Sequence, residues 1–200
     1  MAFTVSTFKS SMAAQGAGAR PSLYRIDING ISATTSFGDN DNLLVKAASI
    51  PAANIAPLAV NYAGRAYKWN GFRTYDTWTV TVINDEDFVA RNRMMNWMRS
   101  IGGHLDGNRT TAYGSPTFGN TDNWIDGNAT VSQLGTDGKV KQVYKFYNLW
   151  PTEIAEIPVD WSSDAIQEYT IGFAYDYWGH GSGPKPETDF KDVINATSST

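Results

Sequence analysis

Residues 75–83 read Tyr75-Asp76-Thr77-Trp78-Thr79-Val80-Thr81-Val82-Ile83, which is the most regular alternation in the chain. Because successive side chains of a strand point to opposite faces, this segment has one large apolar face and one polar face. Asp76, Trp78, Val80 and Val82 lie on one face, and the opposite face carries Tyr75, Thr77, Thr79, Thr81 and Ile83. The pattern predicts a strand that buries its tryptophan and valines and leaves its threonines exposed.

Six further segments show strand patterns, at residues 23–29, 43–49, 65–71, 129–134, 139–147 and 166–178. The last of them places five apolar side chains on one face: Tyr169, Ile171, Phe173, Tyr175 and Tyr177. Asp137-Gly138 stands between 129–134 and 139–147 and predicts a β-hairpin, because these residues supply the positive φ angles of a tight turn. One helix of about 15 residues is expected over 85–101, where an acidic start is followed by apolar residues at helical spacing.

The rest of the chain divides into one domain with additions at its surface. Residues 1–19 predict an N-terminal arm, with Val5, Phe8 and Met12 at helical spacing. Residues 50–64 contain Pro51 and Pro57 and are expected to form a long exposed loop, because proline cannot donate to a β-ladder. Residues 20–178 form the β-domain, with a long loop at 102–128, and residues 179–200 form a C-terminal extension. The predicted fold class is mainly β, an antiparallel β-sandwich or barrel with one α-helix.

Composition and motifs argue against catalysis. The 200 residues include no cysteine and two histidines, which excludes disulfides and thiol chemistry and leaves little for a metal site. Residues 39–42 read DNDN, like the start of a calcium loop, but Leu44 and Ile50 stand where that loop needs glycine and glutamate, so a turn is expected there. No enzymatic activity, metal or cofactor is expected. No apolar run reaches the roughly 20 residues of a membrane span.

The net charge of −4 is spread unevenly along the chain. Residues 1–121 carry 11 basic and 8 acidic side chains, whereas residues 122–200 carry 5 basic and 12 acidic ones. No basic stripe of the kind found in nucleic-acid binders is present. The asymmetry is either ordinary surface scatter or a polarity across a particle that assembles from copies of the chain.

Seven short runs occur in an order that resembles a known family. They are ARPSLY (19–24), KA (46–47), IPA (50–52), DTWTVTVINDE (76–86), LWPT (149–152), VDW (159–161) and AYDYW (174–178). Over roughly residues 19–178, the chain resembles the tail tube proteins of contractile-tailed bacteriophages, whose relatives include the tubes of contractile injection systems. Compared with that family, the loop at 102–128 is longer and the tail after residue 178 is added.

The resemblance implies a structural subunit of a virion tail. Hexameric rings would stack into a hollow tube, and the phage genome would pass through the lumen during ejection without specific binding. Each subunit is expected to contribute four strands to a shared inner β-barrel. The implied partners are other copies of the chain, the sheath protein, the baseplate and the tail terminator proteins, with assembly in the host cytoplasm.

A conduit for DNA needs a neutral or acidic wall, because a basic lining would bind phosphates and hold the genome. The polar strand faces therefore supply the candidates for the lumen: Asp27, Thr77, Thr79, Thr81, Glu168 and Asp176. For the acidic residues, the alternative is an outer face toward sheath or solvent. In the family, a loop at the place of 50–64 reaches the next ring. The candidates for this contact are Ile50, Pro51, Ala53, Ile55, Pro57 and Leu58.

Two other functions fit the same sequence. The inner tube of an extracellular contractile injection system would carry protein cargo instead of DNA. A monomeric β-sandwich would bind glycans through exposed aromatic residues such as Tyr113, Phe118 and Trp124. Assembly into rings would distinguish a tube from the monomeric module.

Overall fold

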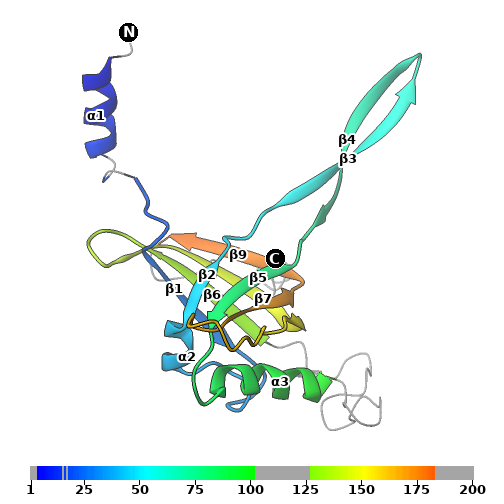
Figure 1. Ribbon diagram of the computed structural model, residues 1–200. Helices are drawn as coiled ribbons and strands as arrows, with labels where there is room; N and C mark the ends of the chain where they lie inside the picture. Colours follow the sequence, from blue (N-terminus) through cyan, green and yellow to red (C-terminus); the bar gives the residue numbers. More distant parts are fainter. Residues whose placement is uncertain (1–3, 15, 17, 102–126, 183–200) are drawn as a thin grey trace, which may run out of the picture.

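The computed structural model describes residues 4–14, 16, 18–101 and 127–182, and its main body is a seven-stranded antiparallel sheet (Figure 1). Along the sheet the strands follow in the order β1 (Tyr24–Asn29), β6 (Gly127–Leu134), β7 (Val140–Ile154), β8 (Glu168–Ala174), β5 (Trp78–Ile83) and β2 (Val45–Ala48), and β9 (Tyr177–Ser182) pairs with β7. The described residues are mainly β, as predicted. Strands β6 and β7 form the hairpin predicted around Asp137-Gly138.

The long strand β7 curls the sheet around the core. Val140 to Leu149 pair with β6, whereas Trp150 to Ile154 pair with β8. At the two ends of the sheet, the Tyr24 hydroxyl of β1 donates to the backbone carbonyl oxygen of Val45 in β2 at 3.0 Å and also contacts that of Lys46. The sheet therefore forms a barrel that is almost closed.

Alternation along the strands fills this barrel with apolar side chains, as the sequence pattern predicted. Both halves of the sheet contribute buried residues: Ile26, Ile28, Val131 and Phe146 from β1, β6 and β7, and Trp78, Val80, Val82, Tyr169, Ile171 and Phe173 from β5 and β8. The side chains between them on the strands point away from the core. The barrel thus has two outer faces, one over β1, β6, β7 and β9 and one over β8, β5 and β2.

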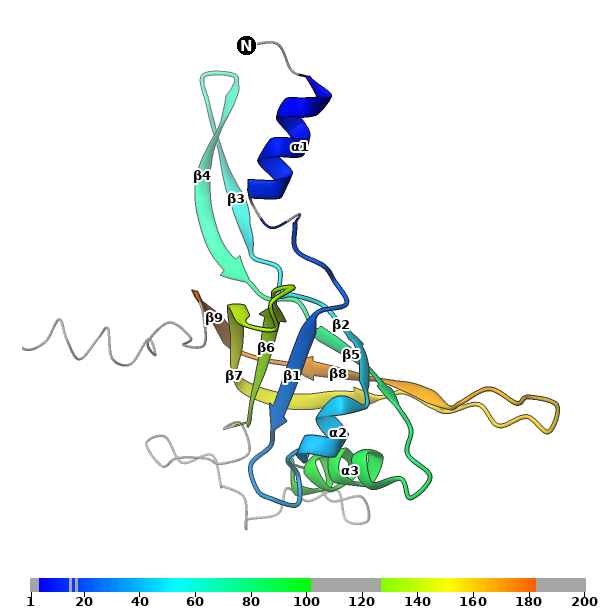
Figure 2. The same ribbon diagram turned by 90° about the vertical axis from the view of Figure 1, so that its left-hand side faces the viewer.

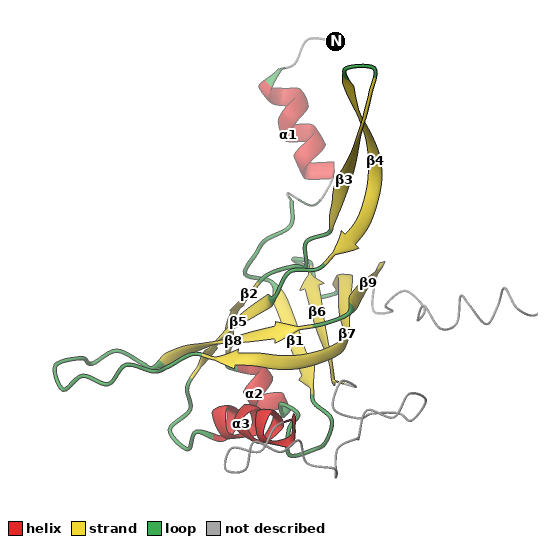
Figure 3. Cartoon of the chain, turned by 90° about the vertical axis from the view of Figure 1, so that its right-hand side faces the viewer, coloured by secondary structure: helices red, strands yellow, loops and turns green. Residues whose placement is uncertain are grey.

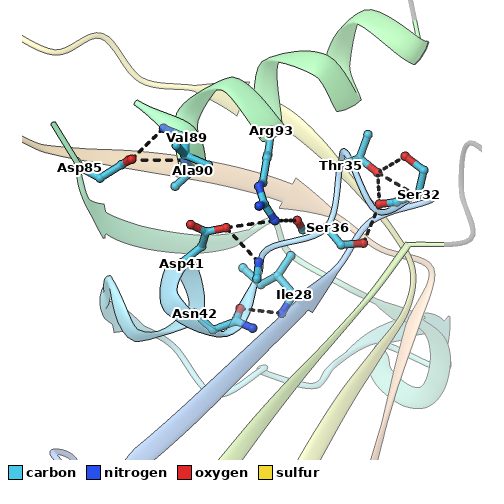
Figure 4. Close-up of polar contacts among 11 residues, drawn as sticks. Ile28, Ser32, Thr35, Ser36, Asp41, Asn42, Asp85, Val89, Ala90 and Arg93 are labelled. Carbon is cyan, nitrogen blue, oxygen red and sulfur yellow. Dashed lines mark hydrogen bonds and ion pairs between the residues drawn. The ribbon is translucent and has the colours of Figure 1, made fainter. Parts of the chain in front are cut away.

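Helix α3 (Val89–Ile101) lies at one end of the barrel beside the short helix α2 (Asp39–Leu43) (Figures 1 and 2). It buries Ala90, Met94 and Trp97 against the sheet. The Asp85 carboxylate accepts hydrogen bonds from the backbone N–H groups of Val89 at 2.8 Å and Ala90 at 3.4 Å, which lack partners inside the helix (Figure 4). The predicted helix is confirmed, with its first residue at Val89.

The turn predicted at residues 39–42 is wrong, because these residues form most of helix α2. Asp41 is buried, and its Oδ2 accepts a hydrogen bond from the Gly38 N–H at 2.9 Å and pairs with Arg93 Nη1 at 3.2 Å (Figure 4). A helix of five residues is not stable alone. Its contact with α3 stabilises it, and the local sequence does not contain that information.

The other end of the barrel carries two projecting elements. Strands β3 (Asn54–Tyr62) and β4 (Arg65–Thr74) form a hairpin, and helix α1 (Val5–Ala14) lies on the segment that leads into β1 (Figures 1 and 3). The prediction of a long loop at 50–64 is therefore wrong for most of its length. The three apolar residues predicted at helical spacing in the arm, Val5, Phe8 and Met12, are exposed on α1.

Two local features allow the hairpin where a loop was predicted. Ala63 and Gly64 have φ angles of 48° and 77°, the positive values that a two-residue hairpin turn requires. The register of the two strands shifts between Ile55 and Pro57, so the proline sits at an irregularity in the ladder where its missing N–H is tolerated. Pro57 thus interrupts the ladder without ending the strand, and Pro51 lies before the strand begins.

Strand boundaries near the C-terminal part also differ from the predictions. Strand β7 does not end at 147 but continues through Pro151 to Ile154. The single strand predicted over 166–178 is two strands, because β8 ends at Ala174 and β9 begins at Tyr177. Tyr177 stacks on Tyr147, outside the core, and so leaves the face that Tyr169 and Phe173 share. Residues 179–182 continue β9 instead of leaving the sheet.

Two of the sequence-based predictions fall outside the described residues. They are most of the loop at 102–128, with Tyr113, Phe118 and Trp124, and the extension after residue 182. Within the described ranges, no helix has both the length and the apolar character needed to cross a membrane.

Candidate functional site

The outer face over β8, β5 and β2 is mostly polar, and we call it the threonine surface. Its side chains on these strands and on the end of β7 are Ala47, Thr79, Thr81, Ile83, Thr152, Glu153, Glu168 and Thr170. Antiparallel pairing places Thr79 opposite Gly172 and Thr81 opposite Thr170. Thr77, just before β5, also lies here, since its methyl group would be 3.5 Å from a Cβ at Gly172. The structure thus brings together four of the six predicted lumen residues.

Glu168 on this surface is not a free negative charge. Lys46 of β2 reaches across β5, and its Nζ lies 2.6 Å and 2.8 Å from the two carboxylate oxygens of Glu168. This partner was not predictable from the sequence, because the strand order that places β2 two strands from β8 is not local information. The charges of this pair cancel and Glu153 adds one carboxylate, so the threonine surface carries no net positive charge.

Asp27 lies on the opposite side of the core, on the outer face of β1. Its Oδ1 accepts hydrogen bonds from Arg25 Nε at 3.1 Å and Nη2 at 3.0 Å. These bonds to Asp27 raise the pKa of Arg25 above its ordinary value. The same face carries larger groups, since Lys145 lies over the Tyr147 ring at 4.7 Å from its centroid and Tyr147 stacks on Tyr177. One flat wall cannot contain both Asp27 and the threonine surface.

Asp176 lies at a bend, between the end of β8 and the start of β9. Its Oδ2 accepts a hydrogen bond from Asn148 Nδ2 at 2.6 Å, and its backbone N–H donates to the Tyr147 carbonyl oxygen at 3.2 Å. Asn148 has a φ of 53°, a left-handed conformation that asparagine tolerates better than most residues, and it sits where β7 changes partner. Asp176 therefore joins two bends of the sheet.

The hairpin has one apolar face, which we call the hairpin face. Register pairs Leu58 with Trp69 and Val60 with Tyr67, and Tyr62 follows on the same side. All five side chains are exposed, with Trp69 at 65%. Of the predicted contact residues, Leu58 belongs to this face, Ile55 and Pro57 lie at the register shift, and Ile50, Pro51 and Ala53 lie before β3.

Sequence reasoning missed Val60, Tyr62, Tyr67 and Trp69 as parts of the hairpin face. A signal was present, because Leu58, Val60 and Tyr62 alternate on one side of Ala63-Gly64 and Tyr67 and Trp69 alternate on the other. An isolated two-stranded hairpin is marginally stable in water. A hairpin with five exposed apolar side chains therefore needs a partner surface.

Among the described residues, no group of three or more His, Cys, Asp or Glu side chains lies close enough to hold a metal ion. The features that remain are an almost closed barrel, an outer face without net positive charge and a projecting apolar hairpin. Together they define a structural protein whose exposed surfaces are suited to contacts with other protein chains.

Comparison with solved structures and with sequence families specifies this class. The tube-terminating cap of the anti-feeding prophage has the same fold, with a TM-score of 0.53, 13% identity and coverage of 82% of this chain and 91% of that chain. A chain in the sheath-tube complex of an extracellular contractile injection system gives a TM-score of 0.50, 12% identity and coverage of 90% and 99%.

The family model described as phage tail tube protein matches residues 19–180. Tail tube protein gp19 of Enterobacteria phage T4 is 33% identical over 162 residues, which are 80% of this chain and 90% of that protein. The tail tube protein of Serratia phage KSP90 is 23% identical over 175 residues, 86% of this chain and 94% of that protein. The chain belongs to the phage tail tube protein family. It is a structural, non-enzymatic component of a phage virion tail, as the resemblance implied.

Proposed function

We propose that six copies of the chain close into a ring by joining part of their sheets into one inner barrel. The end of β7 with β8, β5 and β2 forms a four-stranded array, and the pairings found in the described chain leave β2 with β5 as its only strand partner and Trp150 to Ile154 with β8 as theirs. An open strand edge presents unpaired N–H and C=O groups. Joining six such arrays would satisfy those groups and give a barrel of roughly 24 strands, wide enough for an open lumen.

The threonine surface is the lumen wall in this proposal. It lies on the same four strands, so it faces the axis if the array forms the barrel. Its side chains are uncharged apart from the Lys46–Glu168 pair and the Glu153 carboxylate, so DNA phosphates find no net positive charge to bind. The residues that line the lumen are thus Thr77, Thr79, Thr81 and Glu168. Asp27 faces outward, and Asp176 links the bend of β7 to the bend between β8 and β9. The lack of net positive charge on this four-stranded face is the observation that carries the proposal.

The hairpin is the contact between rings. It projects from one end of the barrel (Figure 1) and exposes an apolar face that the described chain leaves uncovered. Ile50, Pro51, Ala53, Ile55, Pro57 and Leu58 lie on it or at its base and contribute to this contact. Rings joined in this way stack into a tube, with the baseplate and a tail terminator at its ends and the sheath protein around it.

The cargo is the phage genome. The sequence relatives at 33% and 23% identity are phage tail tube proteins, and this supports DNA over the protein cargo of an injection system. The likeness to the injection-system chains, at 12% to 13% identity, concerns the fold. Family membership likewise favours assembly over the monomeric glycan-binding module.

Electron cryomicroscopy of tubes assembled from the purified chain, primed with the baseplate of the same phage if needed, tests the proposal. We expect hollow tubes of stacked six-fold rings with β5 and β8 at the inner wall. A chain that stays a 22 kDa monomer under all these conditions, or a tube with β1 and β6 at its inner wall, would overturn it.

A further inference from the structure

The segment between β7 and β8 is a second projecting surface, which we call the acidic loop (residues 155–167). It extends sideways from the barrel (Figures 2 and 3). Val159, Trp161 and Ile166 are exposed on it, and Trp161 is fully accessible. A fully solvent-exposed tryptophan on a projecting loop is typical of a contact surface.

Charge distinguishes this loop from the rest of the surface. It carries three carboxylates and no basic residue: Glu156, Asp160 and Asp164. Asp160 Oδ1 accepts hydrogen bonds from the Ser162 N–H and hydroxyl, both at 2.9 Å, and these bonds lower the pKa of Asp160. The carboxylate beside Trp161 is therefore held in a fixed position and stays ionised near neutral pH.

The hairpin carries the opposite charge. Residues 54–74 include Arg65, Lys68 and Arg73 and no acidic residue. Lys68 also lines a shallow depression on the hairpin with Val60, Tyr62, Tyr67 and Trp69. The hairpin and the acidic loop thus each combine exposed aromatic residues with charges of one sign, and the two signs are complementary.

We propose that the hairpin of one copy of the chain docks on the acidic loop of another copy. This inference rests on the proposed function and specifies the surfaces that join subunits. Within one chain the two elements extend in different directions (Figure 2), so the contact forms between copies. Because each copy carries both surfaces, the contact is head to tail, and such contacts generate rings or open-ended polymers.

Two charge-reversed variants test the docking. The hairpin variant carries Arg65→Glu, Lys68→Glu and Arg73→Glu, and the loop variant carries Glu156→Lys, Asp160→Lys and Asp164→Lys. Under conditions in which the parent chain forms tubes, we expect each variant alone to lose tube formation, because its two docking surfaces then have charges of the same sign. All six positions are exposed, so the thermal melting of both variants as subunits should match the parent.

Mixing the two variants in equal amounts is the decisive step. The negative hairpins then face positive loops and the positive hairpins face negative loops, so we expect tubes to form again, in which the two variants alternate. A control variant carries Arg20→Glu, Arg99→Glu and Lys139→Glu, at exposed sites outside both surfaces. Its net charge changes by the same amount as that of the hairpin variant, and it should form tubes alone.

The possible failures are distinguishable by electron microscopy. Normal tubes from either reversed variant alone would overturn the docking while leaving the tube function intact. Loss of tubes that mixing does not restore would also overturn it, and would point to another partner for one of the surfaces, such as helix α1 or the sheath. Absence of tubes from the parent chain would contradict the proposed function itself.

Discussion

The indole ring of Trp78 stacks on the ring of Phe146, with centroids 4.4 Å apart and an interplanar angle of 27°. Trp78 belongs to β5 and Phe146 to β7, so this contact joins the two halves of the curled sheet across the core. The indole N–H donates to the Ser49 carbonyl oxygen at 2.8 Å, which satisfies its polar atom in this buried position. The two halves are therefore held together by a residue that lies beneath the threonine surface.

Replacing Trp78 with alanine should destabilise the subunit by about 3 to 5 kcal/mol, because it removes a large buried side chain and leaves a cavity. Thr79→Ala, one residue away on the threonine surface, is the matched control and should change stability by less than about 0.5 kcal/mol. Urea denaturation of both variants measures the difference. Similar midpoints for the two variants would show that Trp78 does not join the halves.

Tyr169→Phe should stabilise the subunit by up to about 1 kcal/mol. The Tyr169 hydroxyl is buried and has no hydrogen-bond partner among the described residues, with the Arg91 guanidinium 5.0 Å from its ring centroid. Burial raises the pKa of Tyr169 above the ordinary value of 10.0. Above pH 10 the unfolded chain therefore releases this proton while the folded chain retains it, so stability falls as pH rises, by up to about 1.4 kcal/mol per pH unit.

Denaturation curves between pH 8 and pH 11.5 measure this effect. The Tyr169→Phe variant should lose less stability over the alkaline part of the range than the parent. Parallel curves for the two proteins would mean that the Tyr169 proton does not contribute.

Arg93→Met should destabilise the subunit by about 2 kcal/mol, because it leaves the buried Asp41 carboxylate without its cation. Lys141→Met breaks the exposed ion pair with Asp137 (2.9 Å) and should have a much smaller effect on stability, because solvent screens that pair. Thermal unfolding of the two variants compares a buried pair with an exposed one. An equal effect of both substitutions would argue that α2 and α3 do not depend on this contact.

Asp176→Ala should destabilise the subunit by about 1 kcal/mol, since it removes the acceptor of the Asn148 side chain at the bend of β7. Asp27→Ala removes an exposed partner of Arg25 and should cost less than about 0.5 kcal/mol. Chemical denaturation distinguishes the two. If Asp176→Ala has no effect on stability, Asp176 does not hold the two bends of the sheet together.

Regular spacing of apolar residues within single elements explains what the sequence could predict. The alternation in β5 and β8 and the helical spacing in α3 repeat over several residues, so a buried face was visible before the structure was known. Trp78 and Phe173 were placed correctly in the core for this reason. The threonine surface followed from the same alternation, because the polar face of a strand is the complement of its buried face.

Features that depend on contacts between distant residues were not predictable. Helix α2 depends on the bond between Asp41 and Arg93, 52 positions apart along the chain. Ala63-Gly64 is a less common turn pair than Asn-Gly. Pro57 interrupts the strand pattern of β3, which precedes this turn. The Lys46–Glu168 pair requires the strand order. Asp27 was grouped with Glu168 because alternation identifies polar faces without showing which sheet half carries them.

Accessibility of single cysteines in the assembled tube tests most directly whether the threonine surface lines the lumen. The chain has no cysteine, so the variants Thr79→Cys and Thr130→Cys each carry one reactive thiol, on the threonine surface and on the outer face of β6 respectively. The probe is a maleimide attached to a globular protein too large to enter the tube, applied to tubes without sheath. We predict that Thr130→Cys is labelled in intact tubes, whereas Thr79→Cys is labelled only after the tubes are dissociated into subunits. Labelling of Thr79→Cys in intact tubes at the rate seen for free subunits would contradict the account.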